Sequence, residues 1–443
     1  MLATLQTHGL AKWTAIAGTM GVFAKTFIPF YLIGSTAIFA ALAAIGCALV
    51  AMNWRQILKL KSGMANIGIL IGLFYTTVII SFLLNSLASV PLTHLLGILI
   101  FHTLFVILGF AASCALRWVF WILVAAGAVY LIFIAQYVVR FGDLMRDGFI
   151  HDVFGVGDSA IYLTFHQNIG VVLGFAALAA LGLSSNRTTR ILAFSALPLV
   201  LLFLFHVAAR GALVALLCSL LFLAAAALWV RSPKLVAFGV IAAAIVVVAT
   251  SSWFYQRALG DRNVNPNAGD ALSRTIREIQ DPRPGFRMQI WARTAERISA
   301  EPNRLLFGRG IGMFPVNDGF GAPDWLLRKA EGSKHYPHNV HLELLYETGI
   351  VGLLLFSIVT LFPLAASLSR WSLFSSAERS AIALYVFYLV SSGFSGAFAY
   401  SYQLQFFFGL AVGVIAIKRS ELAASLNPRI LTPANHGRGC VMV

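Results

Sequence analysis

The sequence predicts an all-α fold, a bundle of membrane-spanning helices, and two observations carry this prediction. Apolar residues make up 59% of the chain and charged residues only 11%, the reverse of the balance in a soluble domain. Stretches of about 20 apolar residues, the length that crosses a bilayer core as a helix, recur from end to end. Backbone polar groups in lipid must be bonded within each segment, so these stretches form helices. We therefore predict a polytopic bundle of about twelve transmembrane helices with one large external loop that contains short helices.

The individual spans follow from the limits of each apolar stretch. The predicted spans are residues 12–27, 29–53, 64–86, 91–115, 118–138, 160–183, 189–208, 211–230, 234–255, 341–369, 379–397 and 401–417. This gives four regions, which are residues 1–255 with helices one to nine, the large loop 256–340, residues 341–418 with helices ten to twelve, and a tail at 419–443.

The charge of the loops predicts their orientation. One alternate set, which includes "NWRQILKLK" and "SSNRTTR", is short and basic, as cytoplasmic loops are. Both termini are then expected in the cytoplasm and the large loop on the external face. The formal charge of +15 belongs to these loops and to contacts with anionic membrane lipid, and we expect no nucleic acid partner.

Five residues break the charge pattern, because they place basic groups on the external face. They are Arg140, Arg146, Arg210, Arg287 and His338. A charge at a membrane-embedded position costs about 2.5–3.5 kcal/mol. Arg210, in the apolar hairpin "LFLFHVAARGALVALL", either marks an interfacial turn or serves a site. His206 would share its helical face if the helix continued through the hairpin.

The large loop carries its own structural signals. "FRMQIWARTAERISAEP" has apolar residues at helical spacing (Ile290, Trp291, Ala295 and Ile298), and "FGRGIGMFP" predicts a glycine-rich turn. From Arg257 to Lys334, Arg outnumbers Lys by eleven to two. The guanidinium fork makes paired hydrogen bonds to phosphate, so this preference indicates phosphate binding.

His338 lies where the large loop re-enters the membrane, and three interpretations are open. It could be a polar helix-start residue, a metal ligand with His335 and His341, or a base. The cysteine spacing and the lack of a D-x-D carboxylate pair favour neither a metal nor another cofactor. Imidazole, with a reference pKa near 6.5, can take a proton from a hydroxyl near neutral pH. Nearby Arg groups would stabilise a departing phosphate, which suits a lipid-diphosphate-linked sugar.

Four stretches resemble one family in sequence order. "KHYPHNVHLELLYETGIVG" is similar to the signature of O-antigen ligases and their polymerase relatives, and "GFRMQIWARTAERISAEPNRLLFGRGIGMF" resembles the part that precedes it. "HVAARGALVALL" resembles the helix start that carries the family's Arg, although Ala replaces the usual small hydroxyl residue. "FHQNIGVVLGFAALAAL" resembles an earlier helix with an Asn near its outer end. The likeness covers residues 130 to 418.

The resemblance implies an O-antigen ligase in the bacterial inner membrane with its active site facing the periplasm. Such an enzyme transfers O-antigen glycan from undecaprenyl diphosphate to a sugar hydroxyl of lipid A–core, without metal and with inversion. It implies His338 as the base. The diphosphate would be held by Arg210, Arg287, Arg140 and Arg146, with support from Asn339, Asn168 and His206.

Other functions remain open. An O-antigen polymerase would use the same donor, and R-x10-G patterns typical of polymerases occur at Arg146, Arg274 and Arg297. Only one external loop is large, which favours a ligase. A protein O-oligosaccharyltransferase ranks third, because it usually has a sizeable external region after the last helices. A flippase for the same lipid would place ionisable residues near the midplane.

Overall fold

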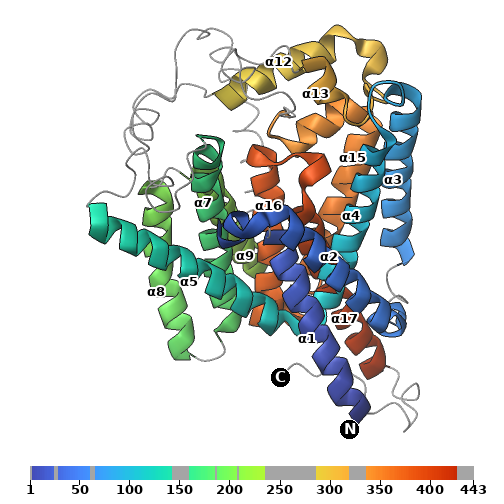
Figure 1. The fold of residues 1–443 in the computed structure, drawn as a ribbon. Coiled ribbons are helices and arrows are strands. Elements are labelled where there is room, and N and C mark those ends of the chain that lie inside the picture. Colours follow the sequence, from blue (N-terminus) through green and yellow to red (C-terminus); the bar gives the residue numbers. More distant parts are fainter. Residues whose placement is uncertain are drawn as a thin grey trace.

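The structure is a computed structural model that describes residues 2–23, 28–59, 65–141, 159–184, 187–206, 209–234, 286–318 and 336–426. Every regular element in these ranges is a helix (Figure 1), which confirms the predicted all-α polytopic bundle. The long helices are α1 (Leu2–Phe23), α2 (Ile28–Lys59), α3 (Ala65–Asn85), α4 (Leu92–Ala112), α5 (Leu116–Phe141), α7 (Ser159–Leu183), α8 (Arg187–His206), α9 (Arg210–Trp229), α15 (Val340–Leu368), α16 (Ser376–Ser395) and α17 (Tyr402–Leu426).

Each predicted span has a matching helix, apart from 234–255, which lies almost wholly outside the described residues. The ends differ most at the two extremes of the chain. Helix α1 begins at Leu2 rather than near residue 12, and α17 continues to Leu426, past the predicted start of the tail at 419. Polar residues extend both helices beyond their apolar parts, because hydropathy marks where lipid ends and not where helical hydrogen bonding ends.

The described residues contain five stretches that are long and apolar enough to cross a membrane. They are Asn66–Asn85, Leu92–Ile132, Arg187–Leu204, Gly211–Trp229 and Val340–Leu368, of which the second comprises α4 and most of α5. Only 6% of the Arg187–Leu204 stretch is buried, so most of its apolar side chains face outward. An apolar surface of this kind is compatible with lipid and not with water, and the chain is a multi-pass membrane protein.

The centre of the bundle is the pair α4 and α17, and close backbone approach holds it together. A Cβ atom at Gly109 of α4 would collide with the Phe406 carbonyl of α17, so only glycine fits there. Such small-residue contacts are typical of membrane helix pairs. Phe105, Phe406 and Phe407 are fully buried beside this contact. Helix α16 packs against α7 and α9, and α15 packs against α3.

The large loop contributes α12 (Phe286–Ala300), a 3-10 turn (Pro302–Arg304) and α13 (Met313–Asp318). Figure 1 shows α12 and α13 together at one end of the bundle, opposite the first turn of α1 and the last turn of α17. The helix predicted from "FRMQIWARTAERISAEP" is confirmed. Ile298 on its apolar face is buried, whereas Glu296 is exposed.

The glycine-rich turn is confirmed, and it docks into a break in α15. Gly308 and Gly349 have positive φ angles of 73° and 70°, and the break in α15 lies at Gly349. Backbone hydrogen bonds run from Gly310 N to Glu347 O (2.9 Å) and from Ile350 N to Leu305 O (2.9 Å). A side chain at either glycine would strike the opposing backbone. The turn therefore fixes the loop to α15, because the break exposes carbonyl groups that the loop pairs.

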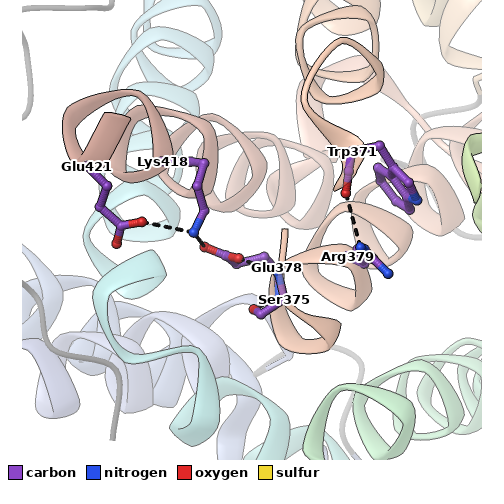
Figure 2. Close-up of polar contacts among 6 residues, drawn as sticks. All are labelled: Trp371, Ser375, Glu378, Arg379, Lys418 and Glu421. Atoms are coloured by element: carbon purple, nitrogen blue, oxygen red, sulfur yellow. Dashed lines mark hydrogen bonds and ion pairs between the residues drawn. The ribbon is translucent and has the colours of Figure 1, made fainter. Parts of the chain in front are cut away.

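At the opposite end of the bundle, α16 begins in a closed polar network (Figure 2). The Ser375 hydroxyl accepts from Glu378 N, and Ser375 N donates to the Glu378 carboxylate (2.6 Å), which forms a capping box. Lys418 of α17 pairs with Glu378 (3.2 Å) and with Glu421 (2.9 Å). These contacts tie the start of α16 to the end of α17.

Candidate active site

Arg287, in the first turn of α12, binds the last turn of α16. Its Nη1 donates to the Phe394 carbonyl (2.8 Å) and to Ser395 Oγ (3.3 Å). The final carbonyls of a helix have no intrahelical partner and carry partial negative charge, so they attract a guanidinium. Burial lowers the pKa of Arg287, and the charge of Tyr336 opposes this shift. These hydrogen-bond acceptors are uncharged, so they hold the guanidinium without neutralising it.

Trp291, one helical turn further along α12, connects the same helix to the start of α15. Its Nε1 donates to the Pro337 carbonyl (2.7 Å), and its ring lies 6.2 Å from that of Phe394. Helix α12 thus contacts both the end of α16 and the segment that leads into α15. Arg287 and His338 are brought into one small region by this helix.

His338 lies directly before α15 in an unusual backbone conformation. Its φ is 56°, the only positive φ of a non-glycine residue in the described ranges. Strain of this kind must be supported by its surroundings and is concentrated at functional sites. The His338 ring packs on Tyr336, with centroids 4.5 Å apart. Burial raises the pKa of the Tyr336 phenol, the negative charge of Glu343 adds to this shift, and Arg287 opposes it.

Asn339 and His341 both lie at the start of α15 and make different contacts there. The Asn339 side chain caps the helix, accepting from Leu342 N (3.0 Å). The His341 ring lies 5.7 Å from that of Phe356, and its Nδ1 is 4.0 Å from the position of a Cβ at Gly393. His338 and His341 thus contact different neighbours.

Arg210 is the first residue of α9, and its backbone lies beside the same end of α16. At the next residue, Gly211, the position of a Cβ is 3.7 Å from both Phe394 Cβ and Ser395 Oγ. Asn168, half-buried on α7, is two residues before Gly170, where a Cβ would overlap Ala209. The starts of α9, α12 and α15, the end of α16 and one turn of α7 therefore converge.

Four predicted residues, His206, Arg210, Arg140 and Arg146, have side chains outside the described part of the structure. The continuous helix that a common face for His206 and Arg210 required does not form, because α8 ends at His206, α9 begins at Arg210 and Ala209 between them is not helical. Arg140 lies in the last turn of α5, where only the backbone is described, and Arg146 lies outside the described residues.

Glu343 braces the turn that follows α16. It is buried on α15, and its Oε2 accepts from Phe398 N (2.9 Å). Phe398 follows Phe394 and Ser395 by a few residues, so this bond fixes the direction of the chain after α16.

The sequence interpretation missed Tyr336 as a site residue. Its ring contacts the His338 ring, and it is close enough to Arg287 to affect the pKa of that guanidinium. Its place in "HYPHN", one residue before the proline that precedes His338, was the available signal. A proline restrains the residue before it to extended backbone, which fixes the direction of the tyrosine.

One comparison with known proteins concerns the same part of the chain. Residues 195–357 match the family model described as O-Antigen ligase, a segment that includes Arg210, Arg287 and His338. A comparison with curated proteins found no match. The family match supports activity of the O-antigen ligase and polymerase type. The match over residues 195–357 supports membership of the O-antigen ligase family.

Proposed function

We propose that this protein is an O-antigen ligase that transfers glycan from undecaprenyl diphosphate to a sugar hydroxyl of lipid A–core. The observation that carries the proposal is the position of Arg287. It is anchored on the end of α16 by neutral oxygens, beside the Tyr336–His338 pair and next to the start of α9.

In the proposed reaction, His338 accepts the proton of the acceptor hydroxyl. The hydroxyl oxygen attacks the anomeric carbon and forms the new glycosidic bond. The bond from that carbon to the diphosphate oxygen breaks, and undecaprenyl diphosphate leaves with the electron pair. Attack from the face opposite the leaving group inverts the anomeric centre. No metal or other cofactor takes part in these steps.

Arg287 and Arg210 hold the departing diphosphate in this proposal, and Arg140 and Arg146 form a second pair. A desolvated guanidinium with uncharged partners gains most from an anion, because the low local dielectric strengthens their attraction. The convergence of α9 and α12 on the end of α16 supports a shared role for the first two residues.

The supporting residues act through position. Asn339 uses its side-chain oxygen to cap α15, and this cap holds His338 directly before the N-terminus of the helix. Asn168 and His206 belong to the turns of α7 and α8 next to the start of α9, and we assign them to contacts with the glycan or the diphosphate. The active site faces the periplasm of a bacterial inner membrane, with both termini in the cytoplasm.

Reconstitution tests the proposed function. Purified protein is mixed with undecaprenyl-diphosphate glycan, lipid A–core and a chelator, and capped lipid A–core is followed on a gel. We expect capped product with the natural chain, and a loss of at least about 100-fold with His338→Ala. Arg117→Ala is the matched control, because Arg117 is exposed at the start of α5, remote from α12, and should leave the rate unchanged.

The same assay separates the alternatives. A polymerase would lengthen glycan on undecaprenyl diphosphate in the absence of lipid A–core, and this result would replace the ligase assignment. In cells, His338→Ala should leave lipid A–core bare while undecaprenyl-linked glycan accumulates outside. Accumulation on the cytoplasmic face would instead establish a flippase.

A further inference from the structure

A second basic site lies at the other end of α12. Arg297 is ten residues after Arg287, which corresponds to about 15 Å along the helix. A pocket of about 600 Å³ opens there, and its charged lining residues are Arg297, Arg304, Arg309 and Glu301. Among the residues that the structure describes, three positive groups and one negative group line the pocket and give it a net positive charge. We call this the basic pocket, and its volume lies within the usual range for small-ligand sites.

The basic pocket is built rather than formed by loose surface chains. Arg309 is largely buried, donates to the Arg297 carbonyl (2.6 Å), pairs with Glu301 (3.3 Å) and lies 4.6 Å from the centre of the Tyr346 ring. Asn317 donates to the Tyr346 hydroxyl (3.3 Å). These contacts fix the pocket wall, because each side chain is restrained by at least one neighbour from another element.

Arg304 contributes a positive charge to the basic pocket, and a neutral hydrogen-bond acceptor orients its guanidinium. It is exposed, and its Nη1 donates to Asn85 Oδ1 (2.5 Å) at the end of α3. An amide oxygen orients the guanidinium without cancelling its charge. The remaining N–H groups of the fork can bind a phosphate oxygen pair.

The position of the basic pocket indicates which class of ligand it would bind. Asn85, part of its lining, is the last residue of the apolar stretch Asn66–Asn85, so the pocket lies at the level where hydrocarbon ends. Leu84, Leu306 and Phe307 beside it are more than half exposed. An apolar rim below a cationic pocket suits an amphiphile whose chains lie in the bilayer and whose anionic headgroup lies at its surface.

We propose that the basic pocket binds the phosphate-bearing headgroup of an anionic membrane lipid, with Arg304 and Arg297 as the main phosphate contacts. Arg309 is a wall residue that keeps the pocket open. The site is separate from the Arg287–His338 region, and the proposal does not depend on the proposed function, because it concerns lipid binding and not glycan transfer.

Fluorescence anisotropy of the full-length chain in non-ionic detergent tests this site. The probes are acyl-labelled dioleoyl phosphatidic acid and acyl-labelled dioleoyl phosphatidylcholine. We expect phosphatidic acid to bind at least about tenfold more tightly, and Arg304→Gln or Arg297→Gln to weaken it by about tenfold without changing phosphatidylcholine. Arg117→Gln, which removes an exposed charge at the start of α5, should leave both affinities unchanged.

Three outcomes would overturn the proposal. They are equal affinity for the two lipids, an unchanged phosphatidic acid affinity in both arginine variants, and displacement of the probe by inorganic phosphate at the concentration at which unlabelled lipid displaces it. The last result would show a site for free phosphate. Arg304→Lys and Asn85→Ala provide a second test if the glutamine variants fail to fold. The lysine keeps the charge without the fork, and the alanine releases Arg304, so each should weaken binding about threefold.

Discussion

The two ends of α16 bind basic side chains in different ways. At its start, Glu378 is buried, closes a capping box with Ser375 and pairs with Lys418, which pairs again with Glu421 (Figure 2). At its end, Arg287 binds the Phe394 carbonyl and the Ser395 hydroxyl. Carboxylates neutralise the cation in the first case, and neutral oxygens merely orient it in the second.

Under the proposed function, this difference separates the residues that stabilise the fold from those that serve activity within one helix. A neutralised network contributes to folding and has little attraction left for a ligand, because its charges are already satisfied. An oriented but unneutralised guanidinium attracts an anion, and the cost of its burial is offset only when the anion arrives. Substitutions at the start of α16 should therefore change stability, and those around its end should change activity.

The largest expected effect is at the functional end. Arg287→Ala should reduce glycan transfer in the reconstituted assay by about 100-fold to 1,000-fold, because it removes a cation that stabilises the leaving diphosphate. The thermal unfolding midpoint should change little, since the Trp291–Pro337 bond still holds α12. Arg287→Lys keeps the charge and should retain part of the rate. A large drop in stability with an unchanged rate would reverse the comparison.

Glu378→Ala tests the other end of α16. The change removes the buried partner of Lys418 and half of the capping box, so we expect a loss of about 2–3 kcal/mol in the free energy of unfolding. Thermal unfolding in detergent measures it. The transfer rate per folded molecule should stay within about twofold of the natural chain. A selective loss of rate would show that the two ends are coupled.

Ser395→Ala should give a smaller effect, and on activity alone. Arg287 loses its weaker acceptor, at 3.3 Å, and keeps the Phe394 carbonyl at 2.8 Å. One long hydrogen bond from the guanidinium to a neutral acceptor corresponds to about a threefold to fivefold change in rate. Ser391→Ala, one turn earlier on α16, is the control. Equal effects in both variants would remove Arg287 from the explanation.

The sequence predicted the helices well, because each one has to be apolar over a length set by the bilayer. It predicted the glycine-rich turn at "FGRGIGMFP" for a similar local reason. It did not predict the break of α15 at Gly349, since the stretch from Val340 to Leu368 has one continuous apolar pattern. The break becomes possible only when the distant loop pairs the exposed backbone groups.

The sequence predicted most of the residues that form the candidate site, but only partly which atoms those residues contact. Basic residues on the expected external face of an apolar chain identified Arg210, Arg287 and His338. The partners of Arg287 are a carbonyl and a hydroxyl more than a hundred residues away, and no local pattern indicates them. Tyr336 was missed because a tyrosine at a membrane surface is common, and its position before the proline does not by itself predict the contact with His338.

The smallest expected effect concerns the outer member of the network at the start of α16. Glu421 is 46% exposed and lies three residues after Lys418, so solvent screens the pair and its contribution should be about 0.5 kcal/mol or less. Glu421→Gln should lower the thermal unfolding midpoint by less than about 2 °C and leave glycan transfer unchanged. Lys418 keeps Glu378, its buried partner. If Glu421→Gln destabilised the protein as much as Glu378→Ala, the stability of this end would depend on the whole cluster of charges rather than on the buried pair.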